Sequence, residues 1–189
     1  PPDHPPGTYW YHPHNHGSTA LQVSSGMEGA LIIEGGLDDV PAIKAATEQI
    51  MVFQQIPYDQ SGEIESYDNF GPCAWEPMNR EHTINGQLYP TISMHPGEVQ
   101  RWRMIHAGVR ESILPMLFGP NTGPDTTVIG DILKLQQNDL YEVALDGIAL
   151  GRVDKWPVPD LSNPQNVRGV ELEPGYRSDV LVKAGAPGT

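Results

Sequence analysis

The 189-residue sequence has a single cysteine, Cys73, so no disulfide can form within the chain. It is also poor in positive charge: 11 Lys and Arg stand against 24 Asp and Glu, for a formal net charge of −13. An acidic surface repels phosphate backbones, which argues against nucleic acid as a partner. No apolar run approaches the roughly 20 residues that cross a bilayer, so no membrane span is predicted.

The residues that are abundant point to a packed, strand-rich protein. Hydrophobic residues make up 38% of the sequence and charged residues 19%, a balance that favours a globular core over disorder. The chain also contains 20 Gly and 19 Pro, which break helices and form turns. We therefore expect an all-β protein of short strands.

Short β-rich segments separated by turn signals recur along the sequence. A strand is expected to begin at residue 8 and run toward 16, residues 17–26 to form a loop or short helix, residues 37–47 to form a connector with a helical turn, and residues 119–131 to form a loop. The other expected strands are 29–34, 49–56, 81–85, 98–106, 112–118, 140–145, 168–173 and 178–183. This pattern predicts an antiparallel sandwich or barrel.

The segment His12-Pro13-His14-Asn15-His16 holds three of the seven histidines. In a strand, side chains two apart share a face at roughly 6–7 Å between Cα atoms, so His12 and His14 could reach one polynuclear metal site. Neutral imidazole suits copper, zinc, iron or nickel. Pro13 makes the strand an edge or irregular one. On spacing alone, solvated histidines that bind metal weakly are an equal alternative.

The wider sequence around these histidines resembles a known motif. The segment GTYWYHPH at 7–14, followed by GMEGALII at 26–33, resembles the second copper-binding motif of the multicopper oxidases, most closely in bacterial copper-efflux oxidases and related laccases. The segments NGQLYPTI at 85–92, PGEVQRWR at 96–103 and LEPGYRSDVLV at 172–182 are similar to that family's second domain.

The resemblance implies a cupredoxin-like, Greek-key β-sandwich or barrel, with one partial and one nearly complete domain. Residues 1–36 would be the C-terminal part of domain 1 with its His-x-His copper motif, and residues 37–47 would be a linker. Residues 48–189 would be domain 2, which in three-domain members is a copper-free spacer.

The resemblance also implies a function. His12 and His14 would each bind a different copper of the type 3 pair in a trinuclear cluster. The enzyme would couple one-electron oxidation of a small reducing substrate to four-electron reduction of dioxygen to water. The family's other copper motifs, including the type 1 site, are absent here and would lie in the start of domain 1 and in domain 3. The chain alone is therefore predicted to be inactive, and the resemblance implies a periplasmic or secreted location.

Other residues have expected structural roles. Cys73 has no adjacent histidine and is interpreted as a structural or loop thiol. His106 stands where the family often has Asn, which favours a structural hydrogen bond. Of Trp10 and Tyr11, one is expected to pack in the core and the other to shield the copper site. His16 occupies a position that the family does not use as a ligand.

Three alternatives are less well supported by the residues. A copper-free cupredoxin relative with a structural or interaction role would have lost His12 and His14, which are both present. A copper nitrite reductase would carry His-Cys where this chain has His-Pro-His. A two-domain laccase would carry copper motifs that residues 48–189 lack. The reducing substrate stays open among phenols, cuprous ion, bilirubin-like pigments and other metal ions.

Overall fold

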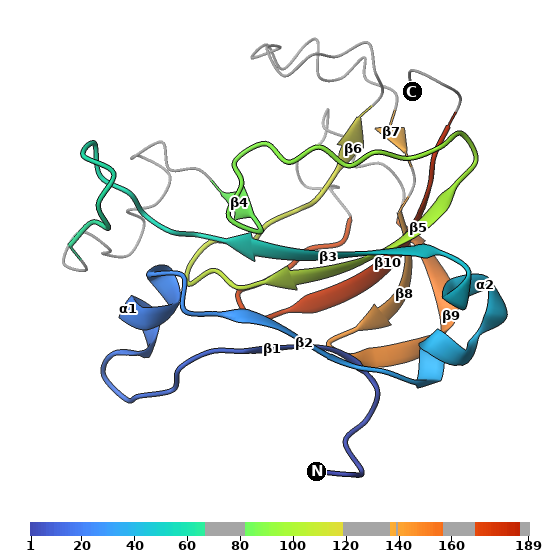
Figure 1. Cartoon of the computed structure of the whole chain (residues 1–189), viewed down its shortest axis with the longest axis horizontal. Coiled ribbons are helices and arrows are strands. Elements are labelled where there is room, and N and C mark those ends of the chain that lie inside the picture. The colour runs from blue at the N-terminus through green and yellow to red at the C-terminus, as the bar shows by residue number, and fades with distance from the viewer. Residues whose placement is uncertain (67–81, 119–136, 139, 157–168, 186–189) are drawn as a thin grey trace.

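The computed structural model describes residues 1–66, 82–118, 137–138, 140–156 and 169–185 (Figure 1). Within these ranges the chain is mostly β. Its strands are β1 (Gly7–Tyr11), β2 (Gly29–Ile33), β3 (Thr47–Gln54), β4 (Thr83–Ile84), β5 (Val99–His106), β6 (Leu117–Phe118), β7 (Gln137–Asn138), β8 (Leu140–Leu145), β9 (Ile148–Trp156) and β10 (Arg177–Lys183). Its helices are α1 (Thr19–Ser24), the 3₁₀ helix η1 (Gly36–Asp39) and α2 (Pro41–Lys44).

The main layer of the described part is a six-stranded sheet in the order β4-β3-β5-β10-β8-β9. The sequence predicted antiparallel pairing throughout, and this is wrong for one pair, because β3 runs parallel to β5 with Thr47 opposite Gln100. A parallel pair needs a long crossover, and residues 55–98 between the two strands supply it. The sheet is therefore mixed.

Strand β5 lies inside this sheet and carries the core. Every residue of β5 after Val99 is buried, as expected for a strand flanked on both sides and covered on both faces. Its Met104 packs in a buried cluster with Leu172 and Val180. The exposed fractions are 1% for Met104 and 0% for the other two side chains.

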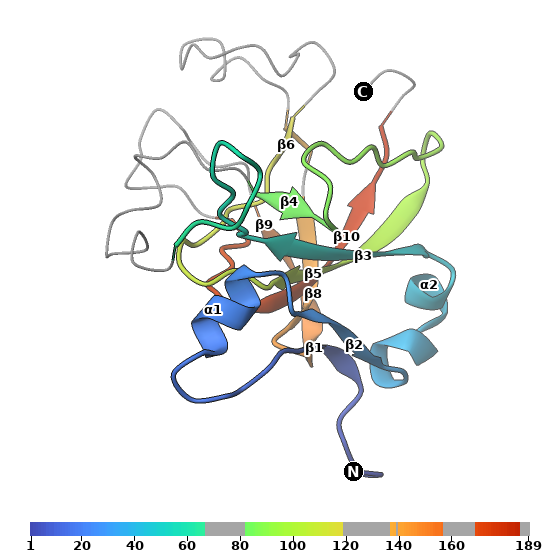
Figure 2. The same ribbon diagram turned by 60° about the vertical axis from the view of Figure 1, so that its left-hand side comes forward.

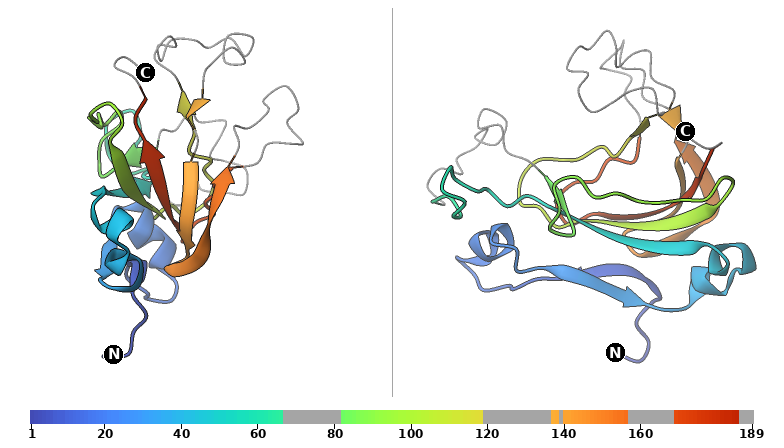
Figure 3. Two further views of the ribbon diagram at one scale, coloured as in Figure 1. Left: turned by 90° about the vertical axis from the view of Figure 1, so that its right-hand side faces the viewer. Right: turned by 45° about the horizontal axis from the view of Figure 1, so that its top comes forward.

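Strands β1 and β2 form a second layer. They pair antiparallel, with Gly7 opposite Ile33 and Tyr11 opposite Gly29. This pair runs alongside the main sheet, and β1 contacts β5, β9 and β10 (Figures 1 and 3). Helix α1 lies near one end of the β1–β2 layer, and η1 and α2 lie near the other (Figure 2). The expected helical turn in 37–47 and short helix in 17–26 are confirmed.

The strand predictions failed at proline and glycine. Residues 112–118 form only the two-residue β6, because Pro115 lacks the N–H that a continued ladder needs. The predicted strand at 168–173 is reduced, in its described part, to a single bridge between Leu172 and Ile113. Strand β9 was missed because Gly151, at φ +67°, interrupts it and its side chains are mostly exposed.

Two predictions fall on residues that are not described: the loop at 119–131 and the structural role of Cys73. The domain boundaries at 36 and 48 stay predictions. None of the helices in the described ranges has the length and apolar character to cross a membrane.

Candidate metal centre

The histidine segment begins where β1 ends. The expected strand through His14 is wrong: β1 stops at Tyr11, which faces Gly29 at the start of β2. Pro13 could not continue the ladder, since it lacks an N–H. A Cβ on Gly29 would lie 2.7 Å from Cε1 of Tyr11, so the tyrosine ring packs directly over this glycine at the last residue pair of the two strands. The histidines therefore lie on a loop that leads into α1.

The loop nevertheless places the imidazoles side by side. The ring centroids of His12 and His14 are 5.8 Å apart, and those of His14 and His16 are 5.4 Å apart. Trp10 stacks on His12 at 4.4 Å between centroids and 30° between planes. His12 is half-buried beneath this contact, whereas His14 and His16 are exposed. The proximity of His12 and His14 was thus predicted from the sequence, but for the wrong reason, because the two residues lie on a loop and not in a strand.

The His12 ring is also fixed by a hydrogen bond. Its Nδ1 lies 2.8 Å from the carbonyl oxygen of Pro13, which can only accept. Nδ1 therefore carries the proton, and the lone pair is left on Nε2. A backbone carbonyl partner of this kind orients a metal-ligating imidazole. The donor set of His12 and His14 fits part of a copper site.

The two rings do not make a complete mononuclear site. Among the described residues, no group of three or more His, Cys, Asp or Glu is arranged to hold one ion. Tetrahedral and tetragonal ions need about four ligands, so further ligands would have to come from elsewhere. The assignment of His12 and His14 as copper ligands stays a prediction.

A buried charge network anchors β1, and sequence analysis did not predict it. The Thr8 hydroxyl donates to Oδ1 of Asp179 on β10 at 2.6 Å. Arg101 on β5 donates to Oδ2 of the same carboxylate, from Nη2 at 2.5 Å and from Nε at 3.2 Å. Asp179 is 1% exposed and Arg101 is 3% exposed. Arg101 and Arg103 alternate with uncharged residues along β5. That pattern is typical of a strand with one face in solvent, so it gives no indication that the two arginines are buried.

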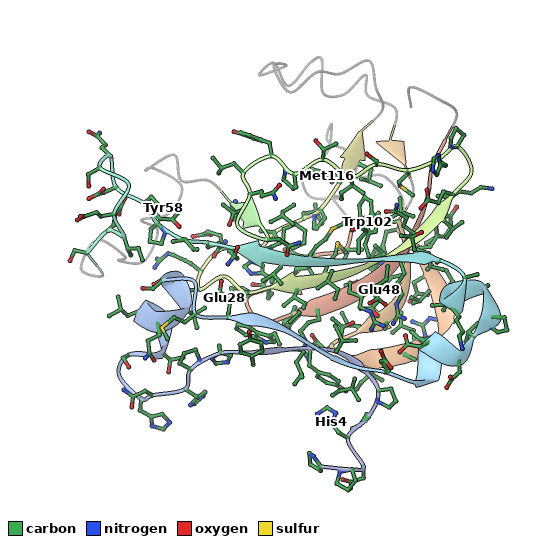
Figure 4. The ribbon with its side chains drawn as sticks, in the orientation of Figure 1. His4, Glu28, Glu48, Tyr58, Trp102 and Met116 are labelled. Carbon is green, nitrogen blue, oxygen red and sulfur yellow. The ribbon has the colours of Figure 1, made fainter. Side chains whose placement is uncertain are left out.

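The network continues into the connector. Arg103 donates to Asp38 of η1 at 2.8 Å and to Glu48 of β3 at 2.6 Å. Figure 4 labels Glu48. Arg101 also donates to Asp38. Burial alone would raise the pKa of Asp38, but the Gly35 N–H and the two guanidinium groups outweigh it and lower that pKa. These groups line a polar cavity of about 440 Å³ between the connector and the sheet.

Glu28 ties the second half of the histidine motif to the main sheet. Its side chain is labelled in Figure 4, and its Oε1 accepts a hydrogen bond from Nε2 of Gln54 at 2.6 Å. Its buried Oε2 has no partner among the described residues. Burial raises the pKa of this carboxyl group, and the Gln54 bond lowers it by less. The strand pair that carries the histidines is thus attached to β3 as well as to β10.

His106 has the structural role expected of it. Its Nδ1 accepts the Gly108 N–H at 2.9 Å, and its Nε2 donates to the carbonyl oxygen of Glu111 at 2.7 Å. The neighbouring Gln55 closes the same loop, because its Oε1 accepts the N–H of Arg110 at 3.0 Å. Burial lowers the pKa of His106 below its ordinary value, and the Glu111 bond only partly opposes this.

This geometry predicts a loss of stability in acid. The folded chain holds His106 neutral, because protonated Nδ1 could not accept the Gly108 bond. The stabilisation is therefore complete above the ordinary histidine pKa of about 6.5 and is lost as the pH falls toward the lower folded pKa. Burial shifts the pKa of His82 in the same direction. The urea midpoint should therefore decrease as the pH is lowered from about 7.5 to about 5.5. For one proton, the free energy of unfolding should change by up to about 1.4 kcal/mol per pH unit.

His106→Asn is the matched variant, because the Asn Oδ1 can replace Nδ1 as the acceptor of the Gly108 N–H and the amide does not titrate. Its midpoint should depend less on pH than that of the wild type. His95→Gln, at an exposed histidine, should keep the wild-type dependence. An unchanged slope in His106→Asn would show that His106 does not cause the acid sensitivity.

Comparisons with known proteins add a family context. No family model matches the chain. The iron transport multicopper oxidase fetC of Epichloe festucae is 31% identical over 108 residues, which cover 54% of this chain and 16% of that protein. This chain therefore corresponds to a small part of that relative.

Solved structures show the same fold. The McoA multicopper oxidase of Aquifex aeolicus aligns with a TM-score of 0.67 and 22% identity, over 94% of this chain and 34% of that one. A multi-copper oxidase of Pseudomonas thermotolerans aligns with a TM-score of 0.63 and 20% identity, over 98% and 37%. Fet3p, described as functioning in iron import, aligns with a TM-score of 0.63 and 20% identity, over 97% and 28%. The cupredoxin-like, sheet-rich fold is thereby confirmed, and the chain spans about a third of the length of these structures.

Proposed function

Because this chain is a relative of the multicopper oxidases, we propose that it forms part of a laccase-like oxidase. That enzyme would couple one-electron oxidation of a small reducing substrate to the reduction of dioxygen to water. The observation that carries the proposal is the adjacent His12 and His14 pair, 5.8 Å apart between ring centroids, in a segment that matches the family's second copper motif.

His12 and His14 would hold copper of a type 3 pair. Copper bound there would supply one-electron redox chemistry, since it changes readily between two oxidation states. The chain's own residues prepare the site. The Pro13 carbonyl keeps Nε2 of His12 free to coordinate, and Trp10 covers one face of the ring and excludes water from it.

The rest of the chain would hold this ligand pair in position. Thr8, four residues before His12, is tied to Asp179, and Glu28 is tied to Gln54. Residues 48–189 would act as a copper-free spacer domain. The remaining copper ligands, including those of the type 1 site, would come from parts of the oxidase that this chain does not contain. A periplasmic or secreted location is part of the same proposal.

The test compares copper content and dioxygen consumption. The 189-residue chain should consume no dioxygen with a phenolic substrate or cuprous ion, because two imidazoles cannot assemble three coppers. In the complete oxidase, His12→Ala or His14→Ala should lower turnover by at least about 100-fold and lower the copper bound per molecule. Metal analysis and an oxygen electrode measure the two effects.

His95→Ala, at an exposed histidine on another loop, serves as the control and should keep full turnover and copper. Turnover by the isolated chain would contradict its assignment as a part of the catalytic unit. Full copper content in the His12→Ala oxidase would remove His12 from the ligand set.

A further inference from the structure

His14 is shared between two pairs of imidazoles. Its ring centroid is 5.8 Å from that of His12 and 5.4 Å from that of His16. Two imidazoles on one tetrahedral ion have centroids about 5 Å apart, because each metal–nitrogen bond is about 2.0 Å long. The His14–His16 spacing is the closer of the two to this value and suits chelation by two rings. No three such side chains converge on one ion in the described part of the chain, so the arrangement is two overlapping pairs.

The two pairs differ in access from solvent. His12 is half-buried beneath Trp10, and its Nδ1 is engaged with the Pro13 carbonyl. His14 and His16 are both exposed. An ion that arrives from water therefore meets the His14–His16 pair before it reaches His12.

The backbone holds the outer pair in place. Pro13 fixes φ immediately before His14. Between His14 and His16, the carbonyl oxygen of Asn15 accepts the Ser18 N–H at 2.9 Å and the Thr19 hydroxyl at 3.0 Å. The turn is thus formed before any ion binds, which lowers the entropy lost on chelation. The net charge of −13 also attracts cations to the surface.

We propose that His14 and His16 form a capture site for divalent copper. The ion would pass from this pair to His12, whose imidazole would replace those of His16 and His14 in turn, so that His14 is left to bind a different copper of the type 3 pair. The transfer exchanges ligands, with no change in oxidation state. The identity of the ion rests on the proposed function, whereas the two-imidazole pair does not.

The experiment titrates aqueous Cu²⁺ into the 189-residue chain in a non-coordinating buffer. Calorimetry gives the dissociation constant of the first ion, and electron paramagnetic resonance counts its nitrogen ligands. The wild type should show two nitrogen ligands. His16→Gln and His14→Gln should each weaken binding by at least about tenfold, and His12→Gln by less than about twofold.

His95→Gln is the matched control at an exposed histidine and should bind as the wild type does. Circular dichroism checks that each variant folds, and His16→Asn gives a second replacement at the same position. Affinity within about twofold of the wild type in both His16 variants would overturn the capture site, as would equal losses in His12→Gln and His14→Gln.

The outcomes also separate this inference from the proposed function. If the complete oxidase loses copper in His12→Gln while His16→Gln has no effect in the chain, the oxidase assignment stands and the capture site is wrong. If the complete protein holds no copper but the chain still binds Cu²⁺ through His14 and His16, the capture site stands and the oxidase assignment is wrong.

Discussion

Asp179→Asn is expected to lower the free energy of unfolding by about 3 kcal/mol, because it removes one of the two carboxylates that pair with the buried Arg101 guanidinium and leaves only Asp38. The two side chains are 1% and 3% exposed, and Arg101 donates to the carboxylate from both Nη2 and Nε. Thr8 loses a charge-assisted acceptor at the same time. Equilibrium unfolding in urea measures the change as a lower midpoint.

Two comparisons identify the cause of that loss. Asp154→Asn breaks an exposed ion pair with Arg152, which bonds Asp154 through Nε at 2.8 Å, and should leave the midpoint unchanged. Adding Arg101→Met to Asp179→Asn removes the buried cation that has lost one of its two carboxylates and should restore part of the lost stability. If the urea midpoint of Asp179→Asn equalled that of Asp154→Asn, the buried network would make no measurable contribution to the stability of the fold.

This network marks the limit of sequence-based prediction for the candidate site. The residue pattern around His12 and His14 identified the pair, because a local motif keeps ligands close along the chain. Thr8 and Asp179 are 171 positions apart, and only the register of β10 with β5 brings the carboxylate under β1. A contact of that range leaves no periodic signal in the sequence.

His16 illustrates a different limit. Strand spacing predicted that it would leave the face shared by His12 and His14 unless the strand continued. The strand ended even earlier, at Tyr11, yet the turn at Asn15 returned His16 to within 5.4 Å of His14. Loop geometry depends on hydrogen bonds such as that from Ser18 to Asn15, which residue periodicity does not encode.

The fold was predictable where strands are apolar and bounded by turn residues. Strand β8 matches its predicted range of 140–145, and β5 begins one residue late at Val99. The mostly exposed edge strand β9 lacks that apolar signal and was missed. The parallel pairing of β3 with β5 was also missed, because the relative direction of two strands is not encoded in either strand's own sequence.

Gly7→Ala is expected to destabilise the chain by about 3 kcal/mol or more, since the added methyl group would overlap backbone atoms that cannot rotate away. A Cβ at this position would overlap the carbonyl oxygen of Gly147 and would lie 2.8 Å from its Cα. Gly147 lies in the turn between β8 and β9 at φ +82°, so that turn is held by its own backbone geometry. Strand β1 would have to move, and it would carry Thr8 and His12 with it.

Gly151→Ala provides the matched control, because φ there is +67° and nothing lies within 4 Å of an added Cβ. Its cost should be about 1 kcal/mol, from backbone strain alone. The two variants therefore separate strain from overlap when their urea midpoints are compared. If β1 carries the ligands as proposed, Gly7→Ala should also reduce copper bound by the complete oxidase, whereas Gly151→Ala should not. Equal midpoints for the two variants would mean that β1 does not press against the β8–β9 turn.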